Sequence, residues 1–349
     1  MKVGLMRSVI DITDLTTEEV QELCDTAIDI ANNPEKYYEA CKHKKLASLF
    51  FEPSTRTRLS FEAAMHELGG DVLTVSGADS SSTAKGESMA DTAKVVSNYA
   101  DIIAMRHPRE GAAFVAAKNA TIPLINAGDG GHCHPTQTTA DLLTIYKTKG
   151  RFDNLTIGLC GDLLYGRTVH SLMHAMERYS NVKFVAISPK ELKLPSYMHT
   201  NNVEETESLE EALPSLDILY MTRIQRERFD DQAQYERLKN SYRLTPELMK
   251  LAKQDCYILH PLPRVDEIAV AVDDDPRAVY FEQTLNGKHM RMALILKLLN
   301  DESNSNFDIG EEGNFTCTNN KCISQVEQEI PHRFYTDSQN IKHCIYCDH

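Results

Sequence analysis

Residues 50–58 read Phe-Phe-Glu-Pro-Ser-Thr-Arg-Thr-Arg and join an apolar run, Lys45 to Phe51, to a helical pattern, Leu59 to Leu68. The apolar run is typical of a strand buried on both faces, and Gly69 and Gly70 can end the helix. Hydroxyls, guanidinium groups and the backbone N–H groups of a helix start together bind phosphate well. A capped helix start with solvated arginines is the alternative. Because α/β proteins bind ligands at the carboxyl ends of parallel strands, the segment favours phosphate.

The alternation of strand and helix patterns continues on both sides of this segment. Strands are expected at Asp71–Val75, Asp101–Met105 and Ile122–Asn126, and helices at Thr16–Ile30, Glu87–Tyr99, Gly111–Ala120 and Thr136–Lys149. Parallel strands joined by helices form a sheet that is covered on both faces. We therefore predict a first doubly wound domain over residues 1–150.

A second alternation begins after Gly150. Its strands are expected at Leu155–Cys160, Val182–Ile187, Ile218–Met221, Tyr257–Leu259 and Ala278–Phe281. The last helix pattern, His289–Leu299, is strongly apolar and is expected to pack back on the first domain. The chain thus predicts an α/β fold of two doubly wound parallel-sheet domains, the second over residues 151–300 with its final helix over 287–300.

The composition limits the classes of function. The chain has 349 residues, of which 42% are hydrophobic and 25% charged, as in ordinary soluble globular proteins. Its formal net charge of −14 argues against nucleic acids and anionic membranes, which are held by Lys and Arg. The first residues reach Asp11 without the apolar run of a secretory signal, so a cytoplasmic protein is expected. Anionic small molecules need only a local cluster of cations and are compatible with this charge.

Four of the nine cysteines lie within the last part of the sequence, at Cys317, Cys322, Cys344 and Cys347. Two closely spaced pairs are typical of tetrahedral Zn²⁺ bound by four thiolates. Two disulfides or four unrelated thiols are the alternatives, and a cytoplasmic location disfavours disulfides. We predict a linker over 301–313 and a small C-terminal zinc-binding module over 314–349. Its acidic residues favour a protein contact over nucleic acid.

The phosphate-binding segment opens a series of motifs that resembles the transcarbamoylases, and among them the aspartate carbamoyltransferases. The motifs are, in chain order, Pro53–Arg58, Met105–Pro108, His134–Gln137, Tyr165–His170, Met221–Gln225 and His260–Arg264. The resemblance implies a transferase that moves the carbamoyl group of carbamoyl phosphate to the amine of L-aspartate, a step of pyrimidine biosynthesis. It also implies that no cofactor is needed at the active site, where positioning and electrostatics do the catalysis.

The resemblance assigns a role to each motif of the first domain. The residues implied to bind the phosphate are Ser54, Thr55, Arg56 and Thr57. Thr57, Arg106 and His134 would donate to the carbonyl oxygen, where negative charge grows as the amine attacks. The alternative for His134 is a structural role as the cap of the helix near Thr136, and the neighbouring His132 is expected to be structural.

Other residues are implied to complete the carbamoyl phosphate site. Gln137 and the backbone carbonyls of Pro261 and Leu262 would orient the carbamoyl NH2 group. Ser81 and Lys85 stand in a Ser-rich stretch that aligns with a family loop reaching into the neighbouring subunit's active site. The resemblance therefore implies a homotrimer with shared active sites, and an implied catalytic set of Arg56, Thr57, Lys85, Arg106 and His134.

The amine acceptor is implied by the second domain. Aspartate carries two carboxylates, which Arg side chains bind through paired hydrogen bonds, and Arg167, Arg223 and Gln225 would bind it together with Lys85. A surface ion pair is the alternative for Arg223. An ornithine enzyme is the alternative within the family, but such enzymes typically carry His-Cys-Leu-Pro where this chain has His260 to Pro263. A non-catalytic scaffold subunit is a further alternative, although it would usually have lost phosphate-binding groups.

The cysteine-rich tail resembles the zinc domain of the aspartate carbamoyltransferase regulatory chain. The resemblance lies in Cys317 to Ser324 and in Cys344 to Cys347. In the family that domain holds catalytic chains and links trimers, so it implies a larger assembly through the tail. Here it is expected to be fused to the catalytic chain, with Zn²⁺ as a structural metal.

Overall fold

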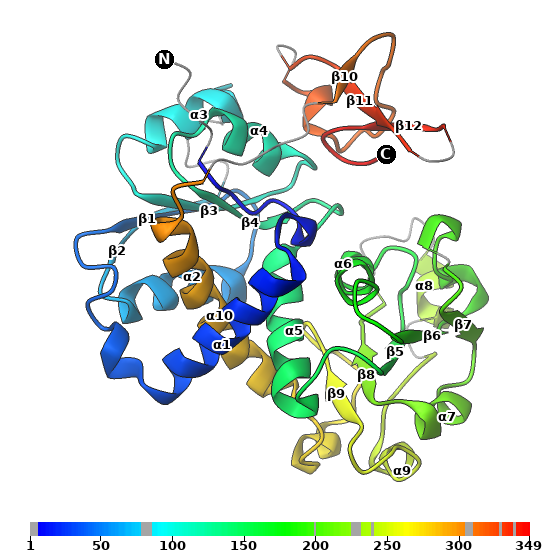
Figure 1. Cartoon of the computed structure of the whole chain (residues 1–349). Coiled ribbons are helices and arrows are strands. Elements are labelled where there is room, and N and C mark those ends of the chain that lie inside the picture. Colours follow the sequence, from blue (N-terminus) through cyan, green and yellow to red (C-terminus); the bar gives the residue numbers. More distant parts are fainter. Residues whose placement is uncertain are drawn as a thin grey trace. The chain divides into compact units, whose positions relative to one another are not determined.

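The computed structural model describes residues 6–77, 86–198, 200–224, 232–238, 241–303, 310–327, 330–337 and 340–349. The chain divides into two compact units: unit 1 combines Met1–Thr136 with Lys288–His349, and unit 2 comprises Gln137–Gly287. Each unit contains a parallel sheet, and unit 1 also contains a small antiparallel sheet (Figure 1). The predicted α/β fold, with two parallel-sheet domains and a small C-terminal module, is confirmed. Among the described helices, none combines the length and the apolar character that crossing a membrane requires.

The parallel sheet of unit 1 has the strand order β2-β1-β3-β4. Its strands are β1 (Lys45–Phe50), β2 (Asp71–Ser76), β3 (Ile102–His107) and β4 (Leu124–Asp129). Strand β1 is buried from Leu46 to Phe50 because it is central and apolar on both faces. Helices α3 (Met89–Val96) and α4 (Ala112–Asn119) pack against one face, where their apolar residues share a core with Ile103 and Met105.

Helices α1 (Thr17–Asn32), α2 (Thr55–Glu67) and the second half of α10 (Tyr280–Asn300) form the other layer of unit 1 (Figure 1). Thr16 is the N-cap of helix α1 and forms a capping box with Glu19. Lys297 of α10 binds Glu19 at 3.1 Å, and Lys288 binds Glu67 of α2 at 2.7 Å. Because these ion pairs are partly exposed, they hold α10 in place less strongly than the burial of its apolar side does.

The sheet of unit 2 has the strand order β7-β6-β5-β8-β9 and is parallel throughout. Its strands are β5 (Thr156–Cys160), β6 (Lys183–Ile187), β7 (Val203–Thr206), β8 (Ile218–Met221) and β9 (Tyr257–Leu259). The helices of the unit include α5 (Pro135–Lys149, from Gln137 on), α6 (Arg167–Met176), α7 (Leu209–Ala212), α8 (Gln232–Leu238) and α9 (Pro246–Met249). Strand β8 is buried along its whole length.

Three sequence expectations differ from the structure. The strand expected at Ala278–Phe281 is wrong, because α10 begins at Tyr280 and Ala278 forms only an isolated bridge with Ile258. Strand β7 was not expected, since it is an edge strand whose central glutamates are exposed and it lacks an apolar run. Helix α2 begins at Thr55, ahead of the expected Leu59. This first turn was not predicted from the sequence because it is polar and carries no apolar period.

The cysteine-rich tail packs on its own chain. Its strands β10 (Glu311–Glu312), β11 (Arg333–Thr336) and β12 (Lys342–Cys344) form the antiparallel sheet. The Glu110 N–H donates to Lys321 O at 3.1 Å, and the Ile323 N–H donates to Glu110 O at 2.9 Å. Tyr346 packs edge-to-face on Phe114 of α4, with 5.7 Å between ring centroids. The tail therefore shares the core of unit 1 that lies around α4.

Close packing of the tail predicts the effect of enlarging Gly111. This residue has φ of +82°, and a Cβ atom there would lie 2.5 Å from Tyr346 O. Gly111→Ala should loosen the tail, measured as faster hydrogen exchange across residues 315–349 and a lower urea midpoint. Gly150→Ala is the matched control, because Gly150 also has positive φ, +68°, but meets nothing within 4 Å. It should carry only the strain of a left-handed alanine, about 1 kcal/mol. Equal effects of the two variants would contradict tight docking of the tail.

Candidate functional site

The topology of unit 1 places one edge of its sheet at a ligand-binding position. Strand order β2-β1-β3-β4 means that the chain leaves β1 in one direction and β3 in the other. In open α/β sheets such a switch point leaves a crevice at the carboxyl ends of the two strands. The segment from Glu52 to Thr57 follows β1, and Arg106 stands near the end of β3. The switch point therefore brings Ser54 to Thr57, which the sequence predicts to bind phosphate, to the same sheet edge as Arg106, which it predicts to bind the carbonyl oxygen.

The start of helix α2 presents donors at this position. Ser54 is the N-cap residue, and within the described part of the chain its side chain makes no capping hydrogen bond. Thr55, Arg56 and Thr57 form the first turn, whose N–H groups have no partner within the helix. Burial, and then the positive charge of Arg106, lower the pKa of Arg56. An anion at this helix start would relieve that repulsion between two cations.

Arg106 is held between an acidic and an imidazole side chain. Its Nε donates to Glu52 Oε1 at 2.6 Å, and its Nη1 lies 3.4 Å from His134 Nε2. Gly128 lies against this pair, since a Cβ atom there would be 3.3 Å from Arg106 Nη1 and 3.4 Å from His134 Cδ2. Glu52 was not predicted to have a role, although it lies within the segment that opened the sequence analysis. It fixes the guanidinium of Arg106.

His134 lies directly before helix α5 and is buried, with 5% of its surface exposed. Its Nδ1 is 3.5 Å from Thr136 Oγ1, while Nε2 is turned to Arg106. The imidazole therefore reaches two groups, and the contact with Arg106 goes beyond the cap role that was the sequence-based alternative. The predicted Ser81, Lys85 and Gln225 lie outside the described residues.

The sheet of unit 2 has its own switch point, between β5 and β8. Arg167 begins α6, which follows β5, and Arg223 is the second residue after β8. Both arginines thus stand at the carboxyl ends of the two strands that flank the switch point, where ligands bind in such sheets. Arg223 is half-buried. Two fixed cations at one sheet edge suit a ligand with carboxylates.

The other predicted residues of unit 2 are positioned by buried polar contacts. Gln137 Nε2 donates to Asp141 Oδ1 at 2.8 Å, which leaves its carbonyl oxygen available to accept. His260 accepts from the Leu262 N–H at 2.8 Å through Nδ1, and its Nε2 lies 2.7 Å from Glu267 Oε1. Leu262 has φ of +54°, so the turn at Pro261 and Leu262 is held in an uncommon backbone conformation by His260.

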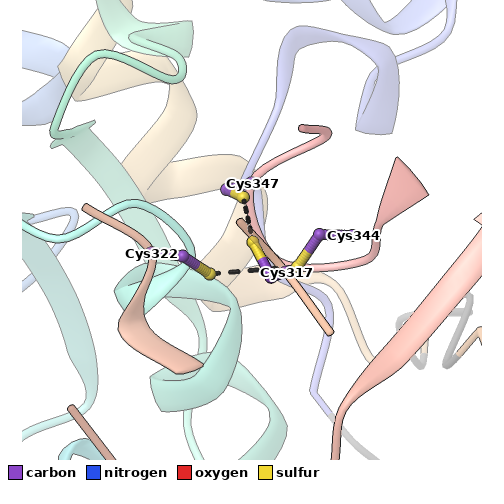
Figure 2. Close-up of side chains that lie close together, drawn as sticks. All are labelled: Cys317, Cys322, Cys344 and Cys347. Atoms are coloured by element: carbon purple, nitrogen blue, oxygen red, sulfur yellow. Dashed lines mark hydrogen bonds between the residues drawn. The ribbon is translucent and has the colours of Figure 1, made fainter. Parts of the chain in front are cut away.

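The four cysteines of the tail form a candidate metal centre (Figure 2). All are buried, and their sulfur atoms lie within 4.8 Å of one another. The Sγ atoms of Cys317 and Cys347 are 3.6 Å apart, and those of Cys322 and Cys344 are 3.8 Å apart. Sulfurs bound tetrahedrally at about 2.3 Å from one ion are about 3.8 Å apart, so the cluster fits a thiolate-bound metal. All nine cysteines are free, which removes the disulfide alternative.

Comparisons with known proteins agree with this geometry. Residues 7–147 match the family described as aspartate/ornithine carbamoyltransferase, carbamoyl-P binding domain, and residues 153–298 match its Asp/Orn binding domain. Residues 312–349 match the metal binding domain of the aspartate carbamoyltransferase regulatory chain. The aspartate carbamoyltransferase catalytic subunit of Lachnoclostridium phytofermentans is 59% identical over 302 residues, which cover 84% of this chain and 98% of that protein.

Solved structures give the same result. The catalytic subunit of M. jannaschii aspartate transcarbamoylase is 47% identical with a TM-score of 0.80, covering 85% of this chain and 99% of that one. Aspartate transcarbamoylase from Trypanosoma cruzi, in complex with carbamoyl phosphate and aspartate, is 35% identical with a TM-score of 0.78, covering 84% and 97%. The chain therefore belongs to the aspartate/ornithine carbamoyltransferase family, and its residues 312–349 form a metal-binding domain of the kind found in aspartate carbamoyltransferase regulatory chains.

Proposed function

We propose that the chain is an aspartate carbamoyltransferase, which transfers the carbamoyl group of carbamoyl phosphate to the amine of L-aspartate and releases phosphate. The observation that carries the proposal is the group at the first switch point: the first turn of α2, which contains Arg56, and the contact of Arg106 with His134. The Trypanosoma cruzi relative binds both substrates. We infer that the reaction belongs to pyrimidine biosynthesis and that the enzyme is cytoplasmic.

The first domain, proposed over residues 1–150, would bind carbamoyl phosphate. The phosphate would be held by residues 54–57 through their backbone N–H groups and through the side chain of Arg56, because a helix start and a guanidinium both stabilise the dianion. Arg106 and His134 would donate to the carbonyl oxygen. Such preorganised donors are each worth on the order of 100-fold in rate.

Aspartate would bind in the second domain, proposed over residues 151–300, through Arg167, Arg223 and Gln225. Two arginines at one switch point suit a dicarboxylate and would repel the side-chain ammonium of ornithine. Gln137 and the carbonyls of Pro261 and Leu262 would orient the carbamoyl NH2 group. The attacking amine's proton would pass to the leaving phosphate, so the reaction needs no metal-bound group among these residues.

We infer that the metal of the tail is Zn²⁺ in a structural role. Four thiolates complete a tetrahedral zinc shell and leave no open position for substrate. The linker would span 301–313 and the module 314–349. We also infer a homotrimer in which Ser81 and Lys85 enter a neighbour's active site. The inference follows the family resemblance of the Ser-rich stretch, and Leu59 of α2 and Leu73 of β2, which are 53% and 41% exposed, are accessible to such a contact.

Acceptor choice is tested first by Arg223→Ala. Losing this cation should lower kcat/KM for aspartate by at least about 100-fold, since a buried carboxylate partner would lose a charge-assisted pair. Binding of carbamoyl phosphate, measured by calorimetry, should change little. Arg237→Ala is the control, because Arg237 is an exposed arginine of the same unit that pairs with Glu191. Equal loss for both substrates would contradict the separate roles of the two domains.

Zinc binding is tested by Cys344→Ala. The bound zinc, measured by mass spectrometry and by a chelating dye, should fall below one per chain, and the tail should become susceptible to protease. Cys24→Ala is the control, because Cys24 is buried in α1 and outside the metal centre. Retention of one zinc per chain in Cys344→Ala would refute the four-thiolate site.

Sharing of active sites is tested by mixing two inactive variants, Arg56→Ala and Lys85→Ala. If each site takes Arg56 from one chain and Lys85 from the next in a closed ring of three, random reassembly of equal amounts restores about a quarter of the sites. Subunit exchange is verified with differently tagged chains. A mixture that stays as inactive as its parents would place Lys85 in its own chain's site.

A further inference from the structure

The turn between β4 and α5 carries His134 and is fixed by hydrogen bonds to the rest of unit 1. Strand β4 ends at Asp129 and α5 begins at Pro135, so only residues 130–134 separate them. The Gly130 N–H donates to His107 O at 2.9 Å, and the His132 N–H donates to Asp129 O at 3.0 Å. The position of His134 therefore depends on what holds the side chains and N–H groups of this turn.

His132 connects the turn to the tail. Its Nδ1 lies 3.2 Å from Asp129 Oδ2, and its Nε2 lies 2.7 Å from Asp348 Oδ2. Both ring nitrogens face carboxylates, and both can donate only when the imidazole is a cation. Asp129 is fixed in turn, because its Oδ2 accepts from the Gly111 N–H at 2.8 Å and its Oδ1 from Asn126 Nδ2 at 3.0 Å. Asp129 is thus held by Gly111 and Asn126 while it contacts His132.

Glu110 makes a second connection between the tail and the turn. Its Oε1 accepts from the Gly131 N–H at 3.0 Å, and its Oε2 accepts from Asn319 Nδ2 at 2.5 Å. Glu110 is 8% exposed, so the two bonds satisfy the carboxylate of a buried residue. Two neighbouring residues of the turn, Gly131 and His132, are thus tied to two separate segments of the tail.

The metal centre determines where Asp348 stands. Asp348 follows Cys347, and its N–H donates to Cys344 O at 2.9 Å, while the Cys344 N–H donates to His349 O at 3.0 Å. The backbone of Asp348 is therefore part of the short loop that supplies two of the thiols. An exposed aspartate would not by itself hold an imidazole, but one fixed by this loop can.

We propose that His132 and Asp348 are positioning residues for carbamoyl transfer: the tail, through Asp348, holds the turn that places His134 beside Arg106. The proposal rests on the proposed function. His132 reaches the reaction only through the backbone that it shares with His134, and Asp348 only through His132. The tail is therefore part of the machinery that orients its own chain's active site, in addition to any contact that it makes with other chains.

The test compares Asp348→Ala, His132→Ala and the double variant in the full-length, zinc-loaded protein. A misplaced donor at the oxyanion should lower kcat on the order of 10-fold in each single variant, with KM for carbamoyl phosphate changed less than about 2-fold. The double variant should lose no more than either single variant, because the two side chains act through one contact. Asp348→Glu should recover part of the rate. Glu311→Ala is the control, an exposed carboxylate of β10 in the same tail.

Zinc content and the thermal midpoint of Asp348→Ala should stay at the wild-type values, within about 2 °C for the midpoint. An unchanged kcat in Asp348→Ala, or losses that multiply in the double variant, would overturn the proposal. A loss of zinc that accompanies the loss of kcat would also overturn it, since the effect would then belong to tail folding. Failure of the proposed function is a different result, because wild-type protein would then release no phosphate with aspartate.

Discussion

The proposed anion-binding arginines that the structure describes depend on one topological constraint, the reversal of strand order in each parallel sheet. Between β1 and β3 in unit 1, and between β5 and β8 in unit 2, the connections leave in opposite directions and open the carboxyl edge of the sheet. A chain with a net charge of −14 needs such places, because scattered cations on an acidic surface would not hold a dianion. Arg56 and Arg106 at one edge, and Arg167 and Arg223 at the other, concentrate positive charge where backbone N–H groups also point outward.

The positive charge concentrated at the first switch point is partly balanced by Glu52, which binds the side of Arg106 that is turned away from His134. Glu52 binds the Nε side of Arg106 and leaves Nη1 turned to His134. Arg56 has no such carboxylate among the groups that shift its pKa, and its pKa is lowered by burial and by Arg106. A bound phosphate would supply negative charge beside a guanidinium that is partly desolvated and lies near a second cation.

The sequence predicted the parts of this arrangement that depend on local patterns. Buried strands such as β1 and β8 carry continuous apolar runs, and the residues that follow them could be placed at the sheet edge from strand order alone. Local sequence patterns do not predict elements whose bounds are set by tertiary packing. The polar first turn of α2 and the exposed edge strand β7 have no apolar period, and Ala278–Phe281 has a strand-like composition but starts α10. The role of His132 could not be inferred either, because its partner Asp348 lies 216 residues away.

The same limit explains why the tail could be identified but not placed. Four cysteines at the right spacing predict a metal centre from local sequence, because each short loop supplies two ligands. Their surroundings are not local: Cys317, Cys322 and Tyr346 share a core with Ala112, Ala116 and other residues of α4. A segment this short cannot bury enough apolar surface to fold by itself, so it needs both the metal and a neighbour. Since that neighbour is the layer beside β3 and β4, the free energy of metal binding also stabilises the elements that carry Arg106 and His134.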